Sequence, residues 1–130
     1  MRERWFAPLL EKSIGTTLFV KRTFPRAKFV LVRQTRMPSR ITRTVHFELN
    51  GHIIVRGKSE IDVKRTHPEA LRLIREGKQA LGFIAQHFKV RRTRMYATTR
   101  TRAFKMSGDI AAKVWERFYL LEPFSKSSIK

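Results

Sequence analysis

Apolar and polar residues alternate along the middle of the chain in a pattern typical of a β-hairpin. Two such runs within residues 43–59 flank Asn50-Gly51, a pair that favours a two-residue turn because both residues tolerate positive φ. With a period of two, the first strand presents three apolar side chains on one face: Val45, Phe47 and Leu49. Arg43 falls on the same face. A guanidinium there keeps its charge, so it must reach solvent or bind an anion.

The rest of the pattern predicts short elements on both sides of the hairpin. Strands are expected over residues 27–37 and 114–124, a long strand or a strand pair over residues 90–104, and helices over residues 3–12, 66–77 and 79–88. The helix that follows the hairpin should begin with Thr66 as N-cap and Glu69 closing a capping box, and Gly77 should end it. Residues 18–24 fit a short helix or an extended segment, and residues 110–113 fit a short helix or a turn. Residues from Ser125 onward are expected to form a frayed tail.

This order of elements indicates the fold class. A helix, three strands, two helices and two or three further strands predict an α+β protein with a single antiparallel sheet and helices packed on one face. The 130 residues are expected to form one domain, residues 1–130, which is long enough to bury a substantial core.

The charge is the most unusual property of the composition. The chain has 29 Lys and Arg against 10 Asp and Glu, a net charge of +19, which predicts salt-sensitive association with polyanions. The excess fits a nucleic-acid binder, an enzyme for a small dianion, or a basic surface that maintains solubility, and charge alone does not separate these.

Two basic runs, residues 91–96 and 100–105, carry aromatic residues between the arginines and are suited to phosphate contacts and base stacking. In the first run, strict alternation places Arg92, Arg94 and Tyr96 together on one face. A solvated basic sheet face is the alternative interpretation. The runs contain no sequence-specific nucleic-acid motif, so any nucleic-acid contact is expected to be non-specific.

Several classes of chemistry find no support in the sequence. Cysteine is absent, which excludes disulfides, thiolate metal sites and a catalytic cysteine. The four histidines lack metal-ligand spacing, and neither a glycine-rich phosphate loop nor a nucleophile elbow is present. No apolar run has the length of a membrane span and the first ten residues lack a signal-peptide core, so we expect a cytoplasmic protein with no membrane partner.

An acidic residue near the end of the sequence has two interpretations. Glu122 lies within the apolar segment of residues 119–124. It is either a surface residue of an alternating strand, or a carboxyl group whose pKa is raised by apolar surroundings and which acts as an acid or a hydrogen-bond partner.

Taken together, a series of short sequence motifs between Leu9 and Phe124 resembles the motifs of one enzyme family. The motifs are Leu9-Leu10-Glu11-Lys12-Ser13-Ile14, Thr42-Arg43-Thr44-Val45-His46-Phe47, Asn50-Gly51, Gly57-Lys58-Ser59-Glu60-Ile61, Leu73-Ile74-Arg75-Glu76-Gly77-Lys78-Gln79-Ala80-Leu81-Gly82, Arg94, Trp115-Glu116-Arg117 and Glu122-Pro123-Phe124. Their order and spacing are similar to those of chorismate lyase, also called chorismate pyruvate-lyase.

The resemblance implies a fold, a reaction and a set of site residues. The family folds as an antiparallel sheet with helices on one face that enclose a small ligand pocket, and it eliminates pyruvate from chorismate to leave 4-hydroxybenzoate, without metal or organic cofactor. The family's carboxylate-binding arginine corresponds to Arg43, and a backbone amide near Ile14 would contact the same carboxylate. Its glutamate falls on Glu122, which as a neutral acid would protonate the departing enolpyruvyl oxygen.

One departure from the family pattern leaves alternatives open. Only Phe118 to Leu121 separate Arg117 from Glu122, where the family has a hairpin, so either the hairpin is lost or Glu122 is not the equivalent residue. Besides the carbon–oxygen lyase, two other functions remain: a non-catalytic domain of the same fold that binds small aromatic acids, and a basic nucleic-acid- or ribosome-associated protein.

Overall fold

The hairpin predicted around Asn50-Gly51 forms the centre of the protein. In the computed structural model both turn residues have positive φ, 52° and 82°, which is the backbone of a two-residue turn between twisted strands. The structure describes residues 4–12 and 14–120. Within them the elements are α1 (Ala7–Glu11), α2 (Thr16–Thr23), β1 (Lys28–Arg36), β2 (Arg40–Leu49), β3 (His52–Asp62), α3 (Pro68–Glu76), α4 (Leu81–Ala85), β4 (Val90–Ala97), β5 (Thr101–Gly108) and β6 (Ala112–Phe118).

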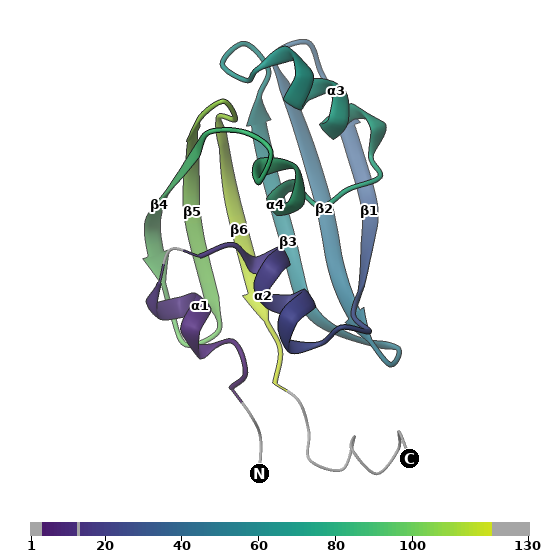
Figure 1. Ribbon diagram of the computed structural model, residues 1–130, viewed down its shortest axis with the longest axis vertical. Coiled ribbons are helices and arrows are strands. Elements are labelled where there is room, and N and C mark those ends of the chain that lie inside the picture. The colour runs from purple at the N-terminus through teal and green to yellow at the C-terminus, as the bar shows by residue number, and fades with distance from the viewer. Residues whose placement is uncertain (1–3, 13, 121–130) are drawn as a thin grey trace.

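The strands form one antiparallel sheet in the order β1-β2-β3-β6-β5-β4. The C-terminal strand β6 is therefore inserted between the first hairpin and the second. Figure 1 shows the helices together on one face of this sheet, so the predicted α+β architecture is confirmed. None of the helices in the described part of the chain is long and apolar enough to cross a membrane.

Several local predictions need correction. The N-cap of α3 is His67, whose Nδ1 accepts a hydrogen bond from the Glu69 amide at 3.1 Å; Thr66 instead donates to the Asp62 carbonyl. Residues 110–113 run into β6 without a helix, whereas residues 90–104 form β4 and the start of β5, which confirms the strand pair among the two expectations for them. Gly77 ends α3 in the left-handed conformation, as predicted. Residues 121–130, including the predicted tail, lie outside the described residues.

The core between the sheet and the helices consists of two separate apolar clusters. The first contains Ile41 and Ile61 with residues of α3 and α4. The second contains Phe47 and Val55 with residues of α1 and α2. Between the two clusters, the inward positions of β2 and β3 are occupied by four other residues: Arg43, Val45, Gly57 and Ser59. Because two of these are small and one is charged, the apolar packing is interrupted there.

Candidate functional site

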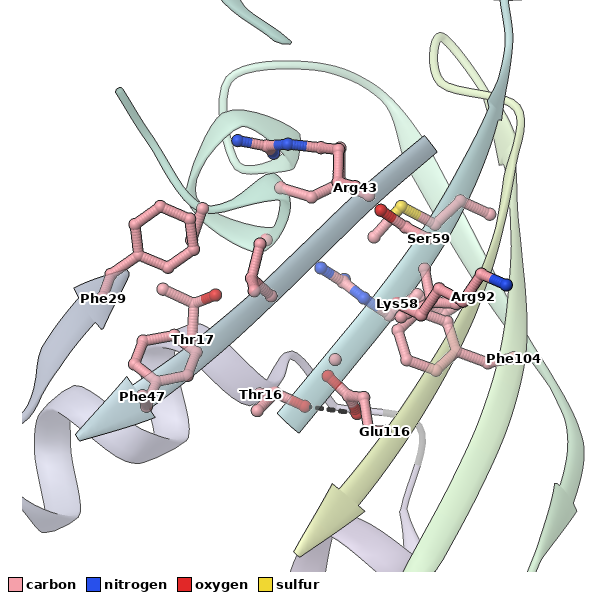
Figure 2. Close-up of a pocket in the computed structure, with 17 residues that line it drawn as sticks. Thr16, Thr17, Phe29, Arg43, Phe47, Lys58, Ser59, Arg92, Phe104 and Glu116 are labelled. Carbon is pink, nitrogen blue, oxygen red and sulfur yellow. Dashed lines mark hydrogen bonds between the residues drawn. The ribbon is translucent and has the colours of Figure 1, made fainter. Parts of the chain in front are cut away.

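A pocket with a cavity volume of about 50 Å³ lies at this interruption. Its walls come from β1, β2, β3, β4, β5 and β6, with α2 and α4 on the helix side. The lining residues are Thr16, Thr17, Phe29, Arg43, Val45, Phe47, Gly57, Lys58, Ser59, Ala80, Leu81, Gly82, Arg92, Phe104, Met106, Val114 and Glu116. Figure 2 shows Arg43 toward one end of this group and Glu116, with Thr16, toward the other.

Small residues create the hollow. A Cβ added at Gly57 would lie 3.1 Å from Cγ2 of Val45, so a side chain there would press on the floor of the pocket. On the helix side, a Cβ at Gly82 would lie 2.7 Å from Oγ1 of Thr17. This contact shows that α4 and α2 approach each other too closely for any larger residue. The pocket therefore depends on glycine both in the sheet and in α4.

Arg43 is the largest fully buried side chain, with an exposed fraction of 1%. Its Nη2 donates a hydrogen bond to the Gln79 carbonyl at 2.9 Å, whereas its Nε and Nη1 have no partner within the described structure. The guanidinium lies 6.0 Å from the centre of the Phe29 ring. Burial lowers the pKa of Arg43 to about 10, so the group remains a cation at neutral pH. A buried cation with unused donors is a site for an anion.

Glu116 supplies the acidic side chain of the pocket and is ion-paired. Its Oε1 accepts hydrogen bonds from Nε of Arg102 and from Oγ1 of Thr16, both at 2.7 Å. A carboxylate paired with a guanidinium accepts charge-assisted hydrogen bonds. Its second oxygen, Oε2, makes no hydrogen bond within residues 4–12 and 14–120 and remains available to a ligand.

Arg102 holds this carboxylate and also anchors the N-terminal segment to the sheet. The side chain is 2% exposed and its guanidinium lies 4.7 Å from the centre of the Phe104 ring. Its Nη groups donate to four oxygen atoms: Leu9 O (2.9 Å), Lys12 O (3.3 Å), Ile14 O (2.7 Å) and Thr16 Oγ1 (2.8 Å). Every nitrogen of the Arg102 guanidinium therefore already donates a hydrogen bond within the fold.

Arg92 is the second cation with an unused donor in the pocket wall. Its Nε is buried without a partner in the described chain, and its Nη2 lies 3.3 Å from the position that a Cβ at Gly15 would take. Burial, and then the positive charge of Arg102, lower the pKa of Arg92, while Glu116 opposes the shift. Arg92 also lines a smaller adjoining cavity of about 10 Å³ with Lys12, Arg94, Arg102 and Phe104. This end of the site is thus strongly positive.

The site residues predicted from the sequence do not all line the pocket. Arg43 lines the pocket. Ile14 lies beside the pocket wall, where its carbonyl binds Arg102, and it does not line the pocket. Glu122 lies outside the described residues. Sequence reasoning missed Glu116, although the alternation of Ala112, Val114 and Phe118 with it on β6 carries the same signal that placed Arg43 on an apolar face.

The predicted faces of the first basic run are wrong beyond Arg94. Arg94 pairs with Phe104, but Tyr96 pairs with Ala103, which is on the opposite face of β5. An irregularity at Met95 causes this change, since one extra residue in a strand moves all later side chains to the other face. Arg92, which precedes the irregularity, faces the pocket, and Tyr96 faces the side of the sheet away from the helices.

The arrangement defines a site for a small anion with an apolar body. Cationic donors line the pocket with a carboxylate acceptor at one end, and aromatic and aliphatic side chains lie between them. Among the described residues, no group of three or more histidine, aspartate or glutamate side chains is placed to hold a metal ion. No family model matches the chain, and no curated protein sequence matches it.

Proposed function

We propose that the pocket binds a small aromatic carboxylate and that the protein is a chorismate lyase, which converts chorismate to 4-hydroxybenzoate and pyruvate. The observation that carries the proposal is the buried Arg43, with two donor nitrogens that have no partner in the described chain. In a dry pocket a carboxylate is the natural partner of such a group. The resemblance of the sequence to the family supports the choice of ligand.

The distribution of charge in the pocket suits both substrate and product. The ring carboxylate would bind Arg43, and the ring would contact apolar side chains such as Phe47 and Phe104. The ring hydroxyl would donate to Oε2 of Glu116. Chorismate also carries a carboxylate on its enolpyruvyl group, for which Arg92 offers an unused buried donor. Two cations and one acceptor thus correspond to the two carboxylates and the hydroxyl of chorismate.

The proposed reaction is a balanced elimination. The ether bond between the ring and the enolpyruvyl oxygen breaks, the proton on the hydroxyl-bearing ring carbon is transferred to the enolpyruvyl group, and the ring becomes aromatic. The products are 4-hydroxybenzoate and pyruvate, with no net oxidation or reduction. Arg43 and Glu116 would contribute by holding the two ends of the ring so that the reacting groups are aligned.

Glu116 takes the position in this proposal that the sequence comparison gave to Glu122. It lines the pocket, and its pairing with Arg102 makes it a hydrogen-bond acceptor for the ring hydroxyl. This differs from the neutral acid that the resemblance assigns to Glu122.

The same ion pair favours a second candidate function. Because Glu116 accepts hydrogen bonds from Arg102 and Thr16, the pocket has an acceptor for a hydroxyl group, and no second carboxyl group among the described residues lines it to protonate a leaving oxygen. A domain that binds 4-hydroxybenzoate without turning over chorismate would need only this arrangement. Incubating the protein with chorismate and quantifying 4-hydroxybenzoate and pyruvate separates the two functions. Equimolar products support the lyase, whereas binding of 4-hydroxybenzoate without products supports the binding domain.

Exchanging each glutamate in turn tests which of them acts. We expect Glu116→Gln to lower turnover by about tenfold to a hundredfold, because a misaligned substrate loses rate steeply, while Glu122→Gln retains the parent rate. Steady-state product formation from chorismate gives the rates, and thermal unfolding confirms that both variants are folded. A normal rate in Glu116→Gln together with a large loss in Glu122→Gln would show that Glu122, and not Glu116, contributes to turnover.

Filling the floor of the pocket is expected to prevent binding. In Gly57→Val the new side chain would meet Val45 and occupy ligand space, since even a Cβ lies 3.1 Å from Cγ2 of Val45. Placing the ligand in the filled space would incur the strain of overpacking, about 1–3 kcal/mol, so the affinity for 4-hydroxybenzoate should fall by about tenfold or more. Thr44→Val, on the other face of β2, is the control. Unchanged binding in Gly57→Val by calorimetry would show that the ligand lies elsewhere.

A further inference from the structure

The face of the sheet away from the helices has a composition that the pocket does not explain. Figure 1 shows the described helices on the near side of the sheet only, so the far side is not covered by any of them. Five exposed cations from the central strands lie on this face: Arg56, Lys58, Lys105, Lys113 and Arg117. None of the five belongs to an ion pair within the described residues.

Two pairs of these cations are directly opposite one another. Arg56 of β3 pairs with Arg117 of β6, and Lys105 of β5 pairs with Lys113 of β6. Like charges at directly opposed positions of a sheet are destabilising. Glu60, which pairs with Lys113 on its other side, offsets only one of the four charges. An arrangement of this kind becomes favourable when a polyanion lies on the face.

Aromatic side chains occupy the space between the two like-charged pairs. Trp115 lies between Lys113 and Arg117 on β6, and it is half-buried. The cross-strand row through it contains Arg33, Thr44, Lys58, Trp115, Ala103 and Tyr96. Tyr96 is 47% exposed and lies two strands from Trp115, a separation of about 10 Å at the usual strand spacing. The small Ala103 lies between them.

A third aromatic residue extends the same surface. The Tyr119 ring lies 6.0 Å from the Arg56 guanidinium and 5.8 Å from that of Arg117. These cation–π contacts orient both arginines beside the ring. The face therefore combines flat π-surfaces with cations on either side of them.

We infer that this face binds single-stranded nucleic acid, with bases stacked on Trp115 and Tyr96 and phosphates bound by the two like-charged pairs. Stacking platforms of aromatic residues on an open sheet, flanked by Lys and Arg, are the usual means of binding unpaired strands without sequence preference. A duplex would offer its phosphates but no base faces to these rings. Of the residues named on this face, only Lys58 also lines the pocket, and neither like-charged pair contains it, so this inference stands independently of the lyase proposal.

The test is a titration of a fluorescein-labelled single-stranded RNA of mixed sequence with the full chain, followed by anisotropy at several salt concentrations. We expect the double variant Lys113→Gln/Arg117→Gln to bind about tenfold or more weakly than the parent and with a shallower salt dependence. The matched control Arg22→Gln/Arg26→Gln, which removes the same charge from exposed residues near the end of α2, should bind within about twofold of the parent if the surface is local. Equal losses in both double variants would overturn the inference, because net charge alone would then explain binding.

Trp115 provides a second readout that net charge does not move. The chain has two tryptophans, so Trp5→Phe leaves Trp115 as the only one, and its emission should be quenched by single-stranded RNA. Trp115→Ala should weaken RNA binding by about fivefold or more, as expected for the loss of a stacked base. Absence of quenching, tighter binding to duplex of equal length, or preference for anionic phospholipid vesicles would each contradict the proposed occupant.

Discussion

Replacing Arg43 by methionine is expected to abolish measurable binding of 4-hydroxybenzoate while the protein remains folded. Removing one partner of a buried charge pair costs about 3–5 kcal/mol, so the Kd should rise by more than about a hundredfold. Arg43 is 1% exposed and has donors without partners in the described chain, and methionine fills a similar volume without any of them. Calorimetric titration of the variant gives the affinity.

The same substitution is expected to stabilise the unliganded protein. Burial lowers the folded-state pKa of Arg43 from its ordinary value to about 10, so folding is penalised at every pH below about 10, and the penalty shrinks as the pH rises above that value. A shift of this size corresponds to roughly 3 kcal/mol. The lost hydrogen bond to Gln79 offsets part of the gain, and we expect a net increase of about 1–2 kcal/mol in the free energy of unfolding at neutral pH.

Arg40→Met on the same strand is the matched control for both effects. Arg40 is exposed and lies on the other face of β2, so its loss should change neither binding nor stability appreciably. If Arg43→Met unfolded more readily than the parent and still bound 4-hydroxybenzoate, Arg43 would be a structural residue.

Replacing Arg102 by methionine is expected to have the largest effect on stability. The variant would leave the Glu116 carboxylate without its cationic partner and four oxygens of the N-terminal segment without their donor. Breaking a buried pair in this way costs about 3–5 kcal/mol. Because those contacts join α1 and α2 to β5, the N-terminal helices should lose protection first.

Urea unfolding measures this loss, and hydrogen exchange locates it. Arg100→Met, an exposed arginine in the β4–β5 turn, is the control and should unfold like the parent. A loss of stability below about 1 kcal/mol in Arg102→Met would place the pair among weak surface contacts, and our description of Arg102 as the anchor of the N-terminal segment would be wrong.

The sequence was sufficient to predict those features of the fold that depend on residues close together in the chain. The Asn50-Gly51 turn depends on two residues that accept positive φ, and it forms at the predicted position. The pairing of β2 with β3 shifts between Phe47 and Glu48, but the residues of β2 pair consecutively, so the period of two still determines which face carries Arg43. The end of α3 at Gly77 follows from the same kind of reasoning.

The rest of the site depends on contacts between distant segments. Sequence gives the alternation that points Arg102 to one face, but it does not reveal that the carbonyls of residues 9–14 lie where they can accept its hydrogen bonds. The irregularity in strand pairing at Met95 is not indicated in the sequence by a glycine or a proline. Glu116 was detectable, since an acid between Val114 and Phe118 violates the apolar face of β6. Its place in the pocket depends on the pairing of β6 with β3 and β5, which the sequence alone does not reveal.

The central claim is that a buried guanidinium in the pocket binds an aromatic carboxylate, and calorimetric titration of the unmodified protein with two ligands tests it most directly. 4-Hydroxybenzoate and its neutral analogue 4-hydroxybenzamide have nearly the same shape and differ in the charge that Arg43 would bind. We predict saturable one-to-one binding of the acid and no detectable binding of the amide. Equal affinity for the two ligands, or no binding of either, would contradict the account.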